Sequence, residues 1–249
     1  MTEKKQVAVK EKSAKPNNKY NIDIEEMARC GVAFGHRSSK KHPKMDPYIL
    51  GVKGGEHVNI INLEKTKELF EKALDYLASL ARENKTILFV GTKPSIKHLV
   101  LEIAQECNMP FVIHRWIGGT LTNFKVVRKR VDHFVDLKEK MKKGELKKYT
   151  KKEQHQFEKE IEDLEEKFGG LVKLKGLPDA LFVIDMKKED LAIREAKRKN
   201  IPVVAIADTN VDPTLADWPI PANDDAISSV KYILEKVKEV ILSNKMGSK

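Results

Sequence analysis

The segment of this sequence that is most like a phosphate-binding loop is Gly91-Thr92-Lys93-Pro94-Ser95, directly after a short apolar run. Phosphate loops carry the pattern GxxxxGK[ST] or GxGxxG, because glycine lets the backbone approach the phosphates. The chain contains neither pattern, and we interpret Pro94 as the first residue of the following helix. A nucleotide-binding enzyme is therefore the weaker interpretation, since no nucleophile stands beside a general base either.

Asp185 and Asp208 are the acidic pair best placed to hold a metal ion. Each follows an apolar run that predicts a buried strand, so neighbouring strands would bring both carboxylates together, where they could share a structural divalent cation. Such residues more often cap the turn or helix that follows. We expect no required cofactor, because the two cysteines and seven histidines lack CxxC and HExxH spacing.

The polar stretch 114–124 has the chemistry to contact RNA. Arg115 supplies a cation, Gly118-Gly119 permits close approach of the backbone, and the side chains of Thr120 and Asn123 suit phosphate or 2′-hydroxyl oxygens. We therefore predict that Arg115, Thr120 and Asn123 bind RNA.

Other parts of the same stretch admit two interpretations. Trp116 could stack on a base, or it could be buried in the core with its indole N–H bonded. Thr122 or Asn123 could cap the helix that follows. A second polar stretch, residues 208–225, is rich in Asp, Asn and Pro, and we interpret it as structural turns.

The charge of the chain predicts a polyanionic partner. Its 249 residues include 47 Lys and Arg against 37 Asp and Glu, a formal net charge of +10. Of the basic residues 39 are Lys and 8 are Arg, and compact ammonium groups suit phosphate oxygens more than base edges.

The positive charge is concentrated in three places. Residues 1–19 hold six Lys and few apolar side chains, which predicts a flexible basic arm. A group that we call the basic knot, with no acid among its neighbours from 36 to 45, consists of Arg37, Lys40, Lys41 and Lys44. Residues 120–152 carry a net charge of +8, whereas residues 153–168 carry −5.

These two oppositely charged runs have helical periodicity. Apolar residues recur at spacings of three and four at Phe124, Val127, Val131, Phe134 and Met141, and again at Phe157, Ile161, Leu164 and Phe168. A polar segment around Gly144 separates the runs, and Gly169-Gly170 ends the second. We predict an inserted antiparallel α-helical hairpin, a coiled coil, held by an apolar seam and by ion pairs between its arms. A charged helical face is also often merely solvated.

Outside the hairpin, apolar runs alternate with amphipathic segments. Continuous apolar strands at 86–90, 110–113, 180–184 and 202–207, separated by helices, predict a doubly wound α/β fold with a mainly parallel sheet buried on both faces. We expect helices near 24–30, 63–83, 96–107, 189–199 and 224–242, and a small β-hairpin from 48–52 and 58–61.

These elements divide the chain into four predicted parts. The parts are a flexible basic arm at 1–19, an α/β domain formed by 20–119 and 171–243, the hairpin at 120–170 and a tail at 244–249. No apolar stretch is long enough for a membrane span or a signal peptide, and cysteine is scarce. We therefore expect a cytoplasmic protein without a membrane partner.

Seven short motifs, in order, make the sequence recognisable. They are Cys30-Gly31-Val32-Ala33-Phe34-Gly35-His36, Pro43-Lys44-Met45, Phe89-Val90-Gly91-Thr92-Lys93, residues 115–124, residues 177–185, Asp208-Thr209-Asn210 and residues 223–227. From about Ile24 to Val240 the chain resembles the bacterial-type small-subunit ribosomal protein S-two family. It departs from the family pattern at Lys41-His42, Val211 and Ala222.

This resemblance implies a structural constituent of the small ribosomal subunit, with a Rossmann-like or flavodoxin-like body and a helical hairpin. Family members bind small-subunit rRNA, contact neighbouring ribosomal proteins and help to dock the large mRNA-binding protein S-one. The resemblance implies no enzyme activity and no small-molecule substrate. Together with the charge pattern, it gives these predicted rRNA-binding residues: Arg37, Lys40, Lys41, Lys44, Arg115, Thr120, Asn123, Lys125, Arg128, Lys129 and Arg130. An extraribosomal protein that uses the acidic arm of the hairpin is a further alternative.

Overall fold

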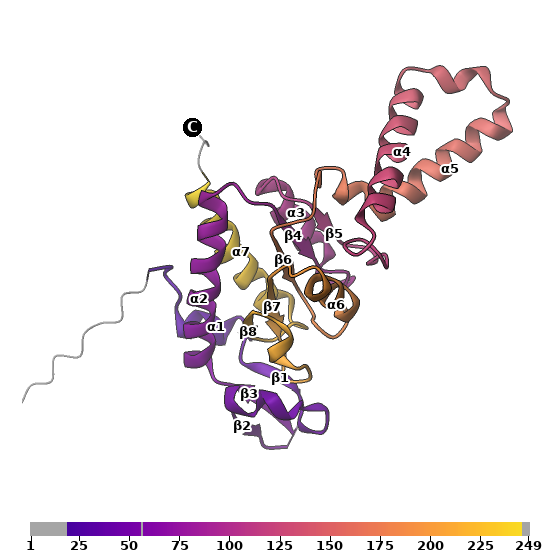
Figure 1. The fold of residues 1–249 in the computed structure, drawn as a ribbon. Coiled ribbons are helices and arrows are strands. Elements are labelled where there is room, and N and C mark those ends of the chain that lie inside the picture. The colour runs from indigo at the N-terminus through magenta and orange to yellow at the C-terminus, as the bar shows by residue number, and fades with distance from the viewer. Residues whose placement is uncertain (1–18, 56, 246–249) are drawn as a thin grey trace, which may run out of the picture.

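A computed structural model of the chain describes residues 19–55 and 57–245, apart from the side chain of Lys147. Of the predicted basic arm only residue 19 is described, and of the predicted C-terminal tail only residues 244 and 245. Figure 1 shows an α/β body with two helices, α4 and α5, projecting from one end and a small sheet at the opposite end.

The centre of the body is a parallel sheet, as the apolar runs predict. Its strand order is β5-β4-β6-β7-β8 and all neighbours are parallel. The strands are β4 (Ile87–Val90), β5 (Phe111–Val112), β6 (Ala180–Val183), β7 (Val203–Ala207) and β8 (Trp218–Pro221). Side chains alternate between its two faces, so that Phe89 and Phe182 enter one core while Leu88 and Leu181 enter the other.

Strand β8 was not predicted from the sequence, because residues 208–225 were interpreted as turns. Its sequence, Trp218-Pro219-Ile220-Pro221, contains two prolines that cannot donate to a sheet ladder. Because β8 is an edge strand that pairs with β7 alone among the described residues, these prolines cost the ladder less than they would in a central strand.

Helices cover both faces of the sheet, so the body fits a doubly wound α/β fold. One face packs against α2 (Leu63–Arg82), α3 (Lys97–Glu106) and α7 (Ile227–Asn244), with the short α1 (Ile24–Arg29) beside α2. The other face packs against α6 (Asp190–Arg198), the first turns of α4 and the last turn of α5.

Two predicted helix starts are wrong by about one turn. Pro94 is not the first residue of α3, because a turn closed by the Lys97 N–H to the Lys93 carbonyl precedes that helix. Helix α7 begins at Ile227 and not at Asp224, since the side chain of Asn223 accepts the N–H groups of Asp225 and Ala226 and forms a turn there.

The small sheet has three strands in the order β1-β3-β2, all antiparallel. The predicted hairpin of β2 (Ile49–Lys53) and β3 (Val58–Ile61) is confirmed. Strand β1 (Phe34–Arg37) was not predicted, because its residues show no apolar alternation. Gly35 lets it pack on the end of β7, where an added Cβ would lie 2.5 Å from Cγ2 of Thr209.

The projecting helices are α4 (Phe124–Lys142) and α5 (Lys151–Phe168), joined by the 3-10 turn Glu145–Lys148. They pack through Phe134, Leu137 and Ile161. The predicted seam is wrong at one point, because Leu137 is buried whereas Met141 is 42% exposed.

Two polar contacts link the arms of the hairpin. His133 Nε2 lies 3.2 Å from Glu160 Oε1, and Lys138 Nζ lies 2.6 Å from Glu165 Oε1. The apolar cluster between the arms is short, and Figure 1 shows α4 and α5 diverging from the body outward. A coiled coil is therefore not confirmed.

The base of the hairpin belongs to the second core of the body. Val127 and Val131 of α4 and Phe168 of α5 pack in the same cluster as Leu88 and Leu181 of the sheet. The boundaries at 120 and 170 thus pass through shared apolar contacts, and the division into an independent body and insertion stays a prediction. Among the described residues no helix is long and apolar enough to span a bilayer.

Close packing at the end of α5 gives a test of this junction. A Cβ at Gly170 would overlap the carbonyl oxygen of Phe111 and lie 2.6 Å from its Cδ2 atom. We expect Gly170→Ala to lower the free energy of unfolding by about 1–3 kcal/mol, measured by urea denaturation. Gly176→Ala is the matched control, since no described residue beyond its chain neighbours has an atom within 4 Å of its added Cβ. Equal effects of the two substitutions would contradict this packing.

Candidate nucleic-acid interface

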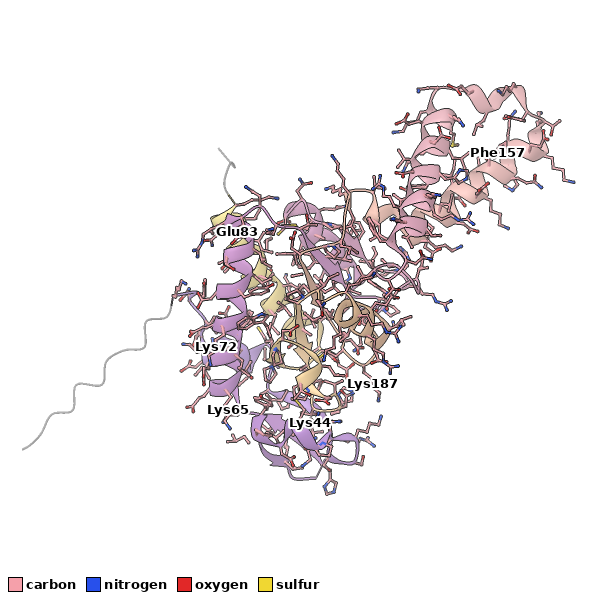
Figure 2. The ribbon with its side chains drawn as sticks, in the orientation of Figure 1. Lys44, Lys65, Lys72, Glu83, Phe157 and Lys187 are labelled. Atoms are coloured by element: carbon pink, nitrogen blue, oxygen red, sulfur yellow. The ribbon has the colours of Figure 1, made fainter. Side chains whose placement is uncertain are left out.

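The basic knot is held against the carboxyl end of β7. The His42 N–H donates to the Thr209 carbonyl at 2.8 Å, and Met45 is fully buried beneath the knot. Lys41 Nζ lies 2.5 Å from Asp46 Oδ1, and Lys44 Nζ lies 2.6 Å from Asp212 Oδ2. These contacts hold the knot against the body, and Figure 2 labels Lys44 at the end of the body that carries the small sheet.

The four cations of the knot differ in their availability. Among the described residues, Arg37 and Lys40 are exposed and form no ion pair, whereas Lys44 is engaged with Asp212. Partial burial would raise the pKa of Asp212, but the Lys44 ammonium and the Thr214 hydroxyl lower it to about 2. Arg37 and Lys40 are therefore the freest cations of the knot for a phosphate.

The polar loop 115–123 is organised by a buried carboxylate, that of Glu195 on α6. Glu195 is 3% exposed. Its Oε1 atom accepts the N–H of Gly119 at 2.7 Å, and its Oε2 atom accepts those of Leu121 and Thr122 at 3.0 and 3.1 Å. The Trp116 indole N–H also donates to it, at 3.1 Å.

These donors decide the charge state of Glu195. Burial alone would raise the pKa of this carboxyl group, but the backbone N–H groups of Gly119, Thr122 and Leu121 and the indole of Trp116 outweigh burial and lower the pKa. The carboxylate therefore stays ionised and fixes the path of the loop.

Glu195 was not predicted from the sequence. A signal was present, because Glu195 falls on the same helical face as the buried residues Ala192, Ile193 and Ala196. A charged side chain on the apolar face of a short helix needs compensating hydrogen bonds. The loop that supplies them is 73 or more residues away in the chain, so the pairing was not visible in the sequence.

The predicted contact residues of this loop differ in their exposure to solvent. Arg115 and Asn123 are exposed. Thr120 is 1% exposed and its hydroxyl donates to the Ile117 carbonyl at 2.6 Å, so its prediction as a direct RNA contact is wrong. Trp116 is 6% exposed, which confirms the buried interpretation of its indole and excludes stacking on a base. Asn123 is the N-cap of α4 but makes no capping bond through its side chain.

At the base of the hairpin, three of the predicted cations are exposed and one is not free. Lys125, Lys129 and Arg130 point to solvent. Arg128 Nη1 donates to the carbonyls of Val172 and Leu174 at 3.3 and 3.0 Å, and its Nε donates to Asp132 at 2.8 Å. Arg128 therefore acts as a brace between α4 and the chain that follows α5.

The positive charge of the hairpin is highest where the two arms are joined. The segment from Lys142 to Lys152 contains six Lys and one Glu, and α5 begins only at Lys151. Assigning all of residues 120–152 to one arm overstates the charge of α4, because part of it belongs to this connection.

The hydrogen-bond donors of the Gly91-Thr92-Lys93 loop already bind acidic side chains. The N–H and hydroxyl of Thr92 donate to Oε1 of Glu189 at 3.1 and 2.5 Å. Lys93 Nζ contacts the carboxylates of Asp224, Asp225 and Asp185. The donors that a phosphate would need thus bind carboxylates, and these carboxylates would repel a phosphate.

Asp185 and Asp208 follow neighbouring strands, as predicted, but they have different partners. Asp185 Oδ1 accepts the N–H of Lys188 at 3.0 Å, the capping role that was the alternative interpretation. Asp208 Oδ2 faces His36 Nδ1 at 3.0 Å, and Asp225 Oδ2 lies 3.4 Å from His36 Nε2. One ligand atom from each of His36, Asp208 and Asp225 lies within 4.8 Å of the others.

Several carboxylates of this region lie close together, and two of them are buried from solvent. Asp208 and Asp224 are 1% and 2% exposed. Burial, together with the charges of Asp208 and Asp185, raises the pKa of Asp224 to about 7. The nearby carboxylate of Asp208, with those of Asp225 and Asp224, raises the pKa of His36 in spite of its partial burial. Neither His36 Nδ1 nor Asp208 Oδ2 makes a hydrogen bond of good geometry with a described residue.

The family model described as ribosomal protein S2 matches residues 27–244 of this chain, which include both the α/β body and the hairpin. The chain belongs to the ribosomal protein S2 family. Membership implies a structural protein of the small ribosomal subunit, from a family that is generally without enzyme activity. Membership also implies association with that subunit and with its rRNA and proteins.

The buried carboxylate of Glu195 gives a test of how the loop is held. We expect Glu195→Gln to lower the free energy of unfolding by about 2–3 kcal/mol at pH 7, because an amide NH₂ would face N–H donors. Since the folded-state pKa of Glu195 is depressed, the stabilisation is complete above about pH 4.5 and is lost as the pH falls through the folded-state value.

Urea denaturation at several pH values measures this difference between wild type and Glu195→Gln. Glu162→Gln, an exposed glutamate on α5, is the control and should change the free energy by no more than about 0.5 kcal/mol. A difference that stayed constant down to about pH 3 would contradict a depressed pKa of Glu195 in the folded state.

Proposed function

We propose that this S2 family protein binds small-subunit rRNA through the basic knot, the exposed part of the polar loop and the cations of the hairpin. The observation that carries the proposal is the set of exposed cations on rigid supports in a member of a small-subunit protein family. The contact residues are Arg37, Lys40, Lys41, Lys44, Arg115, Asn123, Lys125, Lys129 and Arg130. Thr120 and Arg128 position this surface from within.

Binding of this kind is directed mainly at the RNA backbone. Lysine ammonium groups recognise phosphates, and RNA helices are recognised by shape and by 2′-hydroxyl groups. A body with a cationic knot at one end and a cationic hairpin at the other (Figure 1) can bridge two RNA elements. We infer that the protein supports subunit assembly and translation in the cytoplasm by holding such elements together.

Neighbouring proteins of the small subunit are the second proposed class of partner. The resemblance of the motifs implies docking of the large mRNA-binding protein S-one. Co-sedimentation of S-one with small subunits that contain or lack this protein tests that part of the proposal, and equal amounts of S-one in both would contradict it.

The basic knot supplies the sharpest test of rRNA binding. We expect the triple variant Lys40→Ala, Lys41→Ala and Lys44→Ala to incorporate poorly into small subunits. The affinity of the variant for the subunit should also depend less steeply on salt. For each phosphate that a lysine no longer neutralises, the slope of log K against log salt concentration should become shallower by about 0.7–0.9. Co-sedimentation over a series of KCl concentrations measures both effects.

Lys72→Ala is the matched control, because Lys72 lies on α2 and pairs with Glu68 (Figure 2). We expect it to behave as wild type. If the triple variant showed unchanged incorporation and unchanged salt dependence, the proposal that the knot binds rRNA would be wrong.

A structural cation at the cluster of His36, Asp208 and Asp225 is the remaining proposal. An imidazole nitrogen and two carboxylates suit Zn²⁺ better than Mg²⁺, which prefers oxygen ligands. The unsatisfied Oδ2 atom of Asp208, in a residue that is 1% exposed, supports this placement. The cation would offset the charge of four neighbouring carboxylates that Lys93 only partly balances.

A thermal melt of the purified protein with ZnCl₂ or with EDTA tests the cation site. We expect Zn²⁺ to raise the Tm, because a ligand that binds only the folded state stabilises it, and we expect Asp208→Asn to abolish the rise. Asp185→Asn should retain it, since Asp185 is outside the three-residue cluster. An equal rise in wild type and Asp208→Asn would show that Zn²⁺ binds elsewhere.

A further inference from the structure

One face of α2 carries a row of acidic side chains. They recur at spacings of four, three and four residues, and they are Glu64, Glu68, Glu71 and Asp75. Such spacings place side chains on the same side of a helix. All four are exposed except Glu71, which is partly buried. We call these four residues the acidic stripe.

The part of the chain that the structure describes begins on this stripe. Lys19 forms an ion pair with Asp75, and the Tyr20 hydroxyl donates to the same carboxylate at 2.5 Å. Both contacts lower the pKa of Asp75, so this carboxylate is ionised at neutral pH. The last residue of the predicted basic arm therefore binds one end of the stripe, beside α2 (Figure 1).

A hollow next to Asp75 contains an acidic oxygen without a hydrogen bond. The hollow measures about 430 Å³ and is lined by Lys19, Tyr20, Glu71 and Asp75. The Oε1 atom of Glu71 is shielded from solvent and has no hydrogen-bond partner among the described residues. A shielded carboxylate oxygen needs a donor, and the segment that precedes Lys19 is joined directly to the lining of this hollow.

Charge decides the direction in which a basic segment would follow α2 from Asp75. Toward the small sheet this face carries the other three acids of the stripe, whereas in the opposite direction it carries Ser79 and Arg82. Glu68 pairs with Lys72 at 2.6 Å, and Glu64 forms no ion pair with a described residue. A cationic segment that enters at Asp75 is therefore attracted toward Glu64.

The segment before Lys19 has the length and the composition to cover the stripe. A helix rises about 1.5 Å per residue, so the stripe is about 16 Å long, and an extended chain of about five residues spans it. Residues 10–18 contain three Lys and one Glu, followed at the end by Asn17-Asn18. Asparagine amides can donate to Glu71, and lysines further back in the segment reach the more distant acids.

We propose that residues 10–18 of this chain dock along the acidic stripe, with asparagine amide and lysine ammonium groups on its carboxylates. Docking neutralises an acidic face that would otherwise repel a polyanion. It also turns residues 1–9 toward the end of α2 that adjoins the small sheet, the end of the body that carries the basic knot. The inference goes beyond the proposed rRNA function and does not depend on it.

Covalent attachment favours this segment over other occupants of the stripe. Because the segment is tethered at Lys19, its effective concentration at the stripe is in the millimolar range, well above that of a second copy or of a separate basic protein in dilute solution. RNA is disfavoured, since the carboxylates repel phosphates.

Carbodiimide cross-linking of the purified full chain tests the contact, because this reagent joins an amine to a carboxylate only when the two groups touch. We expect mass spectrometry to find cross-links from Lys12 and Lys15 to acids of the stripe. The pair of Lys19 and Asp75 is the internal control. Cross-links of Lys12 and Lys15 only to acids outside α2 would overturn the proposal. In a mixture of isotopically light and heavy protein, cross-links between light and heavy chains would show a second copy on the stripe and would also contradict it.

Trypsin cleavage after Lys12 gives a second readout on the free protein. We expect the triple variant Glu64→Gln, Glu68→Gln and Glu71→Gln to be cleaved faster than wild type, by about two- to fivefold for each ion pair that is lost. A matched triple variant in three exposed acids of α5, Glu158→Gln, Glu162→Gln and Asp163→Asn, makes the same change in net charge and should be cleaved as wild type.

Equal cleavage of wild type and the stripe variant would overturn the docking. If cleavage after Lys12 were slow only in assembled small subunits, a contact of the arm within the subunit would replace the proposal. Failure of this inference leaves the rRNA proposal intact, because both measurements use the free protein and the basic knot is tested separately by incorporation into subunits.

Discussion

Burial of the central parallel sheet on both faces is the constraint on which the rest of the molecule depends. Strands β4, β6 and β7 are fully buried, so polar groups can occur only where the strands end. Both cores draw on alternate residues of the same strands, and the second core includes the base of the hairpin. The arrangement sets where each loop emerges and from which end of the body each helix projects.

Buried carboxylates then fix the loops that leave this sheet. Glu195 gathers the backbone of the 115–123 loop, and Glu189 does the same for Thr92. In both cases an acidic group on or beside α6 takes up N–H donors that an enzyme of this fold class could offer to an anionic ligand. The strand ends are therefore used for structure, and the cations available to a ligand lie outward, on the knot, the small sheet and the hairpin.

Elements with a regular apolar pattern were predictable from the sequence. Elements that depend on packing against residues far away in the chain were not. Strands β4 to β7 of the parallel sheet and the long helices follow from continuous or periodic apolar residues. Strand β8 contains two prolines and exists because β7 offers it an edge, and β1 exists because Gly35 fits against Thr209. Likewise, exposure separates Arg115 from Thr120, although they are five residues apart and seemed equally suited to RNA.

The sequence by itself determined the class of fold, the amount and sign of the charge, and the family, because these depend on residue types and their order along the chain. Tertiary structure alone decided which cations are free. Arg128 binds carbonyls beyond α5, Lys44 binds Asp212, and Lys40 remains exposed without an ion pair among the described residues. Such differences arise from acceptors that are far away in sequence, and only the folded chain brings those acceptors within hydrogen-bonding distance.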